Sequence, residues 1–242
     1  MKQRHIGLDN LKGLASVLML VDHVTKFCFL QISWVNLSLT RFAAPLFTLI
    51  FFHFLFGKKS SNNRGANLFF YSVVLMCCGF YLGATPLQLN ILSAFGLLAI
   101  ANNYAWFKIL FLKNSQLTTL LVLVIAIFDF RISSIFEYNI FIILWLGLFS
   151  KNYMDAKNPF LVLIYNFFVF ALLFPLTEML SFNLGTIFFI LASFVSVPMY
   201  AYFLRFPSMK EYFPRILTVH ALSFFIVHLL ACYLYFYFSI SF

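Results

Sequence analysis

The chain has 242 residues, of which 63% are hydrophobic and only 10% are charged. Because a water-soluble domain carries about 25% charged residues, this composition excludes a water-soluble globular protein and predicts an all-α bundle of membrane-spanning helices. The net charge of +9 does not indicate nucleic-acid binding, since the basic residues are dispersed along the chain rather than gathered into one stripe.

Apolar runs that approach the length needed to cross a bilayer predict about nine helices in a single domain, residues 1–242. In chain order the predicted helices cover residues 11–32, 37–56, 67–83, 87–101, 117–130, 135–149, 160–177, 184–204 and 216–238. The fourth to sixth ranges are short or polar, so about eight or ten spans are the alternatives. The basic start resembles a signal peptide, but its apolar run continues through Asp22 and His23 without a cleavage site. We therefore interpret it as a retained first span.

Basic residues predict which side of the membrane each connection faces. If the N-terminus is cytoplasmic, the opposite side holds only Arg131 in a clear loop. This is the positive-inside pattern, which an even number of spans would break. The basic residues then assigned to the cytoplasm are Lys2, Arg4, Lys58, Lys59, Arg64, Lys108, Lys113, Lys151, Lys157, Arg205, Lys210 and Arg215.

The first predicted helix carries ionisable side chains at positions within the membrane, where each side chain is removed from water. Such groups usually face the bundle interior or a wet cavity, so they point to function. Lys12 and His23 are 11 residues apart, which places them within about 20° around the helix and roughly 16 Å along it, so both can face one cavity. Asp22 lies about 100° from His23. Arg41, at a comparable depth in the second predicted helix, is its expected partner. The alternatives are that Lys12 snorkels to the surface and that His23 only packs.

Two further polar residues lie in apolar runs elsewhere. Asn90, in "LQLNILSAFG", is placed near the outer end of the fourth predicted helix and can hydrogen-bond across helices. His228, in "FFIVHLLACY", shares the last predicted helix with His220, and either histidine can approach the first helix or serve packing. The four cysteines show no metal-ligand spacing, so no metal site is expected.

Four segments resemble the TraX family of membrane pilin N-acetyltransferases: "GLDNLKGLASVLMLVDHV", "TRFAAPLFTLI", "LNILSAFGLLAI" and "ALSFFIVHLLACYLY". That family shows a K-x-x-A-L-x-L-M-x-x-D-H first helix, a G-R-x-A-x-P-L-F second helix, an N-I-L segment and a C-terminal aromatic-x-x-H helix. Lys12 and His23 also resemble the R-x10-H motif of the wider transmembrane acyltransferase superfamily, with Lys in place of Arg. Thr40 stands where the family's second helix has glycine.

The resemblance implies transfer of an acetyl group from acetyl-CoA to the N-terminus of a pilin-like membrane peptide, in the bacterial inner membrane. His23 would act as general base or carry the acetyl group briefly, with Asp22 beside it. The residues implied to bind acyl-CoA or the acceptor are Lys12, Arg41, Asn90 and His228.

Two other functions stay open. One is an O-acetyltransferase of a cell-surface glycan or lipid, within the same superfamily. The other is a small proton-coupled transporter in which Asp22 and His23 relay protons, although no inverted repeat of the kind common in transporters is visible. The sequence also leaves open the oligomeric state and the choice between direct transfer and an acetyl-histidine intermediate.

Overall fold

The computed structural model describes residues 5–29, 38–57, 62–86, 88–104, 107, 115–128, 139–179 and 184–241. Over these ranges the protein is all-α, with ten α-helices and one π-helical segment, which confirms the all-α part of the predicted fold class. Three helical segments are long and apolar enough to cross a membrane: Ser38–Phe56, Thr186–Arg205 and Ala221–Ser239. Together with shorter apolar helices they indicate a multi-pass membrane protein.

Each predicted range overlaps a helix of the structure. The elements are α1 (Ile6–Val24), η1 (Thr25–Phe29), α3 (Ala43–Gly57), α4 (Asn62–Tyr81), α5 (Ile91–Ala101), α7 (Ser115–Phe128), α9 (Ile140–Asp155), α10 (Pro159–Met179), α11 (Leu184–Arg205), α12 (Arg215–Thr218) and α13 (Ala221–Ser241). Part of the predicted charge pattern lies outside the described residues, namely Lys2, Arg4, Lys58, Lys59, Lys108, Lys113 and Arg131.

The first helix begins earlier than predicted because its polar start is buried against the segment after α11. The backbone N–H of Ile6 donates to the carbonyl oxygen of Pro207 at 2.9 Å. The side chain of Asn10 donates to the carbonyl oxygen of Lys210 at 2.8 Å and accepts from the backbone N–H of Tyr212 at 2.9 Å. These bonds satisfy polar groups that would otherwise be costly to bury, so α1 starts at Ile6 rather than at residue 11.

The last predicted range is divided in two. The short helix α12 ends at Thr218 and α13 begins at Ala221. His220 lies in the break and is exposed, so its predicted position inside a continuous helix is wrong. His228 remains inside α13.

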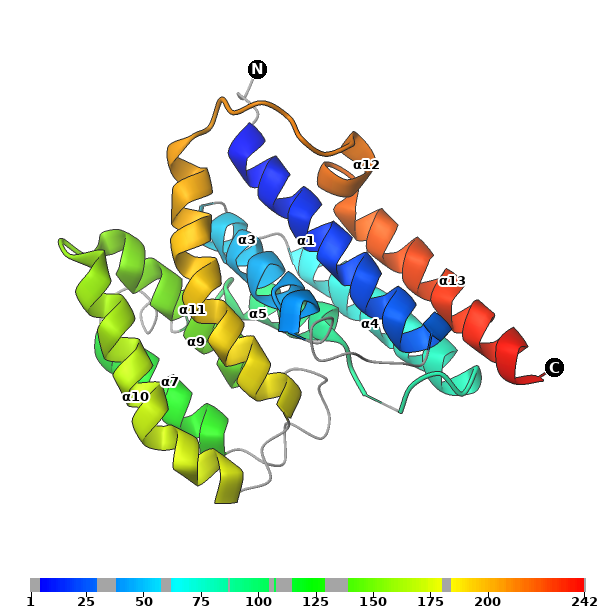
Figure 1. Cartoon of the computed structure of the whole chain (residues 1–242), viewed down its shortest axis with the longest axis horizontal. Helices are drawn as coiled ribbons and strands as arrows, with labels where there is room; N and C mark the ends of the chain where they lie inside the picture. The colour runs from blue at the N-terminus through cyan, green and yellow to red at the C-terminus, as the bar shows by residue number, and fades with distance from the viewer. Residues whose placement is uncertain are drawn as a thin grey trace.

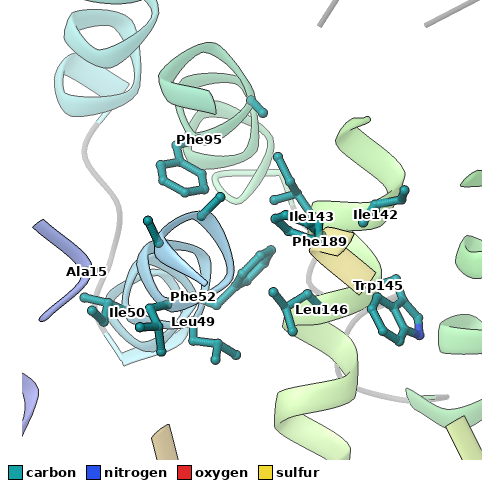
Figure 2. Close-up of a cluster of buried hydrophobic side chains, with 14 of the residues drawn as sticks. Ala15, Leu49, Ile50, Phe52, Phe95, Ile142, Ile143, Trp145, Leu146 and Phe189 are labelled. Carbon is teal, nitrogen blue, oxygen red and sulfur yellow. The ribbon is translucent and has the colours of Figure 1, made fainter. Parts of the chain in front are cut away.

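Helix α3 lies at the centre of the bundle, in contact with α1, α5, α9 and α11 (Figure 1). Figure 2 shows Leu49, Ile50 and Phe52 of α3 surrounded by side chains from these neighbours. Phe52 is almost fully buried, and its ring lies against Gly147 of α9, where the absence of a side chain makes room for it. The helices α7, α9 and α10 form a group of three beside this centre, and α1, α12 and α13 pack together on the other side (Figure 1).

Helices α4 and α5 approach each other closely at two glycines. A Cβ added at Gly96 would lie 2.8 Å from the backbone oxygen of Gly65, and one added at Gly65 would lie 2.9 Å from the backbone oxygen of Gly96. Small residues at a crossing allow helix backbones to pack tightly in a membrane. This contact holds the middle of α5 against the first turn of α4.

Candidate active site

A polar cavity of about 140 Å³ lies between the end of α1 and the start of α5. Asp22 and His23 line it from the last turn of α1, immediately before the chain continues as the π-helical segment η1. Short π-helical segments occur frequently at functional sites. The other lining residues are Met19, Lys26, Phe27, Thr40, Ala43, Ala44, Phe47, Met76, Thr85, Pro86, Gln88, Asn90, Ile91, Phe225, Leu229 and Tyr233.

His23 belongs to a hydrogen-bonded chain that runs from α1 to α13. Its Nδ1 lies 2.8 Å from Nε2 of His228, and Nδ1 of His228 lies 2.7 Å from the carbonyl oxygen of Phe224. A carbonyl oxygen only accepts, so Nδ1 of His228 carries the proton, and Nε2 of the neutral ring is an acceptor. His23 must then donate from Nδ1, which leaves the lone pair of His23 on Nε2. These two hydrogen bonds therefore set the tautomer of His23.

Aromatic rings hold the His23 imidazole in place. His23 stacks on His228 with ring centroids 5.0 Å apart, and Phe225 meets it edge-on at 5.8 Å. His228 in turn stacks on Phe224 at 4.9 Å. Rings packed in this way have few alternative rotamers, so the two histidines keep their relative orientation.

Asp22 receives its hydrogen bond from the start of the second helical segment. The hydroxyl Oγ1 of Thr40 donates to Oδ1 of Asp22 at 2.7 Å. Thr40 directly precedes Arg41, the residue predicted as the partner of Asp22. Among the described residues Arg41 does not line the cavity, so the hydroxyl of Thr40 and not the guanidinium of Arg41 is placed beside Asp22.

Asn90 joins α4 and α5 at the edge of the polar cavity. Its Oδ1 accepts from the backbone N–H of Leu92 at 3.0 Å, which caps the N-terminus of α5. The same oxygen accepts from Oγ of Ser72 in α4 at 2.9 Å. The expected hydrogen bond across helices is confirmed, and it fixes the side chain that lines the cavity.

Lys12 lies at a second, neighbouring cavity. This apolar cavity has a volume of about 270 Å³ and is lined by residues of α1, α3, α4, α5, α12 and α13. Lys12 pairs with Asp9 at 3.1 Å and lies 5.0 Å from the centre of the Phe54 ring. Four residues, Met19, Phe47, Ile91 and Phe225, line both cavities. Lys12 and His23 therefore face two adjacent cavities instead of the single one expected.

Several cavity residues were not predicted. Thr40 was recognised only as a departure from the family pattern, and Gln88 only as a neighbour of Asn90 in "LQLN". Their polarity inside apolar runs was the available signal. His228, predicted as a residue that binds acyl-CoA or the acceptor, contacts the ring of His23. Among the described residues it is not part of the cavity lining.

Comparison with known proteins places the chain in a family. Neither the curated proteins nor the solved structures include a match to it. The family model described as "TraX protein" matches residues 7–228. This range includes all six predicted site residues, from Lys12 to His228. The chain therefore belongs to the TraX protein family, as the resemblance of its four segments predicted.

Proposed function

We propose that this protein is a membrane-embedded acetyltransferase that moves an acetyl group from acetyl-CoA to the N-terminus of a pilin-like membrane peptide. Membership of the TraX family, which is associated with pilin acetylation, supports the reaction class. The observation that carries the proposal is the position of His23. It lines a polar cavity while its Nδ1 is held by His228, so that Nε2 has a lone pair available for chemistry.

The proposed reaction uses that lone pair as a base. The amine of the acceptor attacks the thioester carbonyl, so a C–N bond forms and the C–S bond breaks. Nε2 of His23 takes the proton that the amine loses and passes it to the departing CoA thiolate, which gives the free thiol and restores the neutral imidazole. The same lone pair also suits a route through an acetyl-histidine intermediate. In either route Nδ1 keeps its proton, because His228 offers only an acceptor to it.

Asp22 and Asn90 frame the reacting groups. The carboxylate of Asp22 lines the same cavity as His23 and accepts a hydrogen bond from Thr40, so it can also accept one from the N–H of the acceptor amine and hold that amine in the site. The amide of Asn90 uses its oxygen for Leu92 and Ser72. Its N–H groups are thereby left to donate toward a carbonyl oxygen in the cavity.

The apolar cavity beside the site supports a path for the donor. It is continuous with the lining of the polar cavity through four shared residues, and Lys12 lies on its wall toward the N-terminal end of α1. We infer that the pantetheine arm of acetyl-CoA occupies this cavity and that Lys12 attracts the CoA phosphates at its entrance. The acetyl group then reaches His23 from the side opposite the acceptor.

This path agrees with the membrane orientation that the sequence favours. We infer about nine spans in a single domain of the bacterial inner membrane, with the N-terminus in the cytoplasm. Lys12 then lies toward the cytoplasm, where CoA is found, while Asp22 and Asn90 lie toward the outer side. An acceptor peptide anchored in the same membrane would approach from that side.

The test is CoA release from radiolabelled acetyl-CoA by purified protein in nanodiscs, with a peptide amine or a sugar as acceptor. We expect wild-type protein to release CoA and His23→Ala to lose this activity by about 100-fold or more, the usual contribution of a general base. His53→Ala is the matched control. It removes another histidine of the bundle, hydrogen-bonded to Tyr200 at 2.9 Å and, within the described chain, outside both cavities.

The acceptors separate the competing functions. Transfer to the peptide amine supports the proposal, whereas transfer to the sugar alone would assign the protein to O-acetylation. If acetyl-CoA neither binds nor is cleaved by folded wild-type protein, both acetyltransferase functions are refuted, and substrate flux in proteoliposomes would be the next measurement.

A further inference from the structure

A third cavity lies far from the two histidines, among α7, α9 and α10. It has a volume of about 300 Å³. Helix α9 packs closely on both α7 and α10, whereas α7 and α10 have little contact with each other, so the cavity opens between them. The lining residues are Gln116, Thr119, Asn152, Leu161, Val162, Tyr165 and Asn166.

The lining of this cavity includes Asn152, whose side-chain oxygen is a buried acceptor that no described residue satisfies. Asn152 is 6% exposed, and its Nδ2 donates to Oγ1 of Thr119 at 2.9 Å. Its Oδ1 is buried and has no hydrogen-bond partner in the described part of the chain. A buried polar atom without a hydrogen-bond partner lowers the stability of the folded protein. A donor from outside the chain would remove this cost at Oδ1 of Asn152.

The neighbouring amide shows that this acceptor is a local exception. Asn166 accepts from Nε1 of Trp145 at 3.2 Å and donates to the carbonyl oxygen of Val162 at 2.9 Å. Both ends of its side chain are therefore used within the protein, while Asn152, which also lines the cavity, has one end used and the other without a partner among the described residues. The cavity lining contains no charged side chain among the described residues.

The entrance of the cavity faces an apolar surface. On α10, Leu161 is 60% exposed and Tyr165 is 47% exposed; on α7, Leu117 is 71% exposed and Leu121 is 56% exposed. In a membrane protein such surfaces face lipid. Asn152 lies in the last turn of α9, and Gln116 and Thr119 lie in the first two turns of α7, so the cavity is at the helix ends. We infer that these helix ends lie level with the lipid headgroups.

We infer that this cavity binds a membrane phospholipid whose headgroup carries an N–H or O–H donor, with that donor satisfying Oδ1 of Asn152. Ethanolamine and glycerol headgroups both have the required donor, and a choline headgroup has none. The acyl chains would lie along the exposed apolar faces of α7 and α10. The inference rests on the membrane location of the chain and is independent of the acetyltransferase proposal.

The test measures thermal stability in nanodiscs made of phosphatidylcholine alone or with added phosphatidylethanolamine or phosphatidylglycerol. A ligand that binds only the folded state raises the unfolding midpoint. We expect a rise of several degrees with one or both donor-bearing lipids over phosphatidylcholine. Asn152→Leu replaces the amide by an apolar side chain of similar size and should give the same midpoint in all three membranes. Asn103→Leu, which removes an exposed amide outside this cavity, should keep the wild-type response.

A second variant distinguishes the two headgroups. Asn152→Asp keeps an oxygen acceptor and adds a negative charge, so it should strengthen the response to ethanolamine and weaken the response to the anionic glycerol lipid. This variant and the wild-type lipid series decide the question if Asn152→Leu does not fold. An unfolding midpoint for wild-type protein that is equal in all three lipids would overturn the inference and leave an ordered water as the partner of Asn152.

Discussion

The hydrogen-bonded chain behind His23 makes a specific prediction for His228. Replacement of His228 by Phe keeps an aromatic ring of similar size between His23 and Phe224, but removes the acceptor that lies 2.8 Å from Nδ1 of His23. The proton on Nδ1 then has no partner in a buried position. His23 can avoid this cost by moving the proton to Nε2, which removes the lone pair that the proposed reaction needs.

The size of the effect follows from the cost of that unsatisfied group. A buried donor without a partner costs about 1–3 kcal/mol, which corresponds to roughly a 5- to 150-fold shift between the two tautomers. We therefore expect kcat of His228→Phe to fall by a factor in this range. KM for acetyl-CoA should change little, because among the described residues His228 lines neither the polar nor the apolar cavity.

The assay is steady-state CoA release by wild-type, His228→Phe and His228→Gln proteins in nanodiscs. Gln offers a side-chain oxygen that can accept from Nδ1 of His23, so this variant should recover part of the lost kcat. His53→Phe, a histidine substitution outside the site, controls for general damage to the bundle. If His228→Phe folds and keeps wild-type kcat, or if KM rises while kcat is unchanged, then His228 does not position His23 and the argument fails.

Three other predictions concern the frame around the site. Thr40→Val removes the hydroxyl that donates to Asp22 at 2.7 Å. Because hydrogen bonds to charged groups contribute about 1.5–3 kcal/mol, kcat/KM should fall by roughly tenfold or more. An unchanged kcat/KM would show that this hydrogen bond is dispensable. Gly96→Val places a Cβ 2.8 Å from a backbone oxygen of α4. This substitution should lower the free energy of unfolding by about 1–3 kcal/mol, measured by thermal melting beside the wild-type protein. An equal or higher melting midpoint would contradict the close crossing of α4 and α5. Cys28 of η1 and Cys232 of α13 are free thiols on two elements that pack against each other. A protein in which the other two cysteines are Ser should form a Cys28–Cys232 disulfide with a copper–phenanthroline oxidant, seen as a loss of free thiols in intact monomer. Persistent thiols would contradict the pairing of η1 with α13.

Hydropathy predicted the helices well because a membrane imposes a length and a composition on every span. The same constraint made polar residues in apolar runs informative, and Asp22, His23 and Asn90 do line one cavity. Helix ends were predicted less well where polar side chains find partners. Asn10 is buried by bonds to the segment after α11, which no local pattern reveals.

Helical spacing predicted the face of α1 but not its surroundings. Lys12 and His23 lie toward the same side, yet Met19 of α1 and Phe47 of α3 stand on the boundary between their two cavities. Which side chains separate the two cavities depends on how α3 and α13 cross α1. For the same reason the hydrogen bond to Asp22 comes from Thr40 rather than from the adjacent Arg41: a shift of one residue along a helix turns a side chain by about 100°.

For His228 the sequence left two alternatives open, a packing role and a place in the pocket. In the structure His228 is packed inside the bundle and contacts His23, which lines the polar cavity. A histidine that is 8% exposed inside an apolar helix can pack there only if its two nitrogens are satisfied. The carbonyl oxygen of Phe224, one turn earlier, accepts a hydrogen bond from Nδ1–H of His228. Nε2 of His228 is then an acceptor, and it needs a donor to be satisfied. The donor it finds is His23. The requirements of burial alone therefore produce a histidine that determines the tautomer of its neighbour, and this is how a packed side chain on α13 comes to control which nitrogen of His23 on α1 carries the proton.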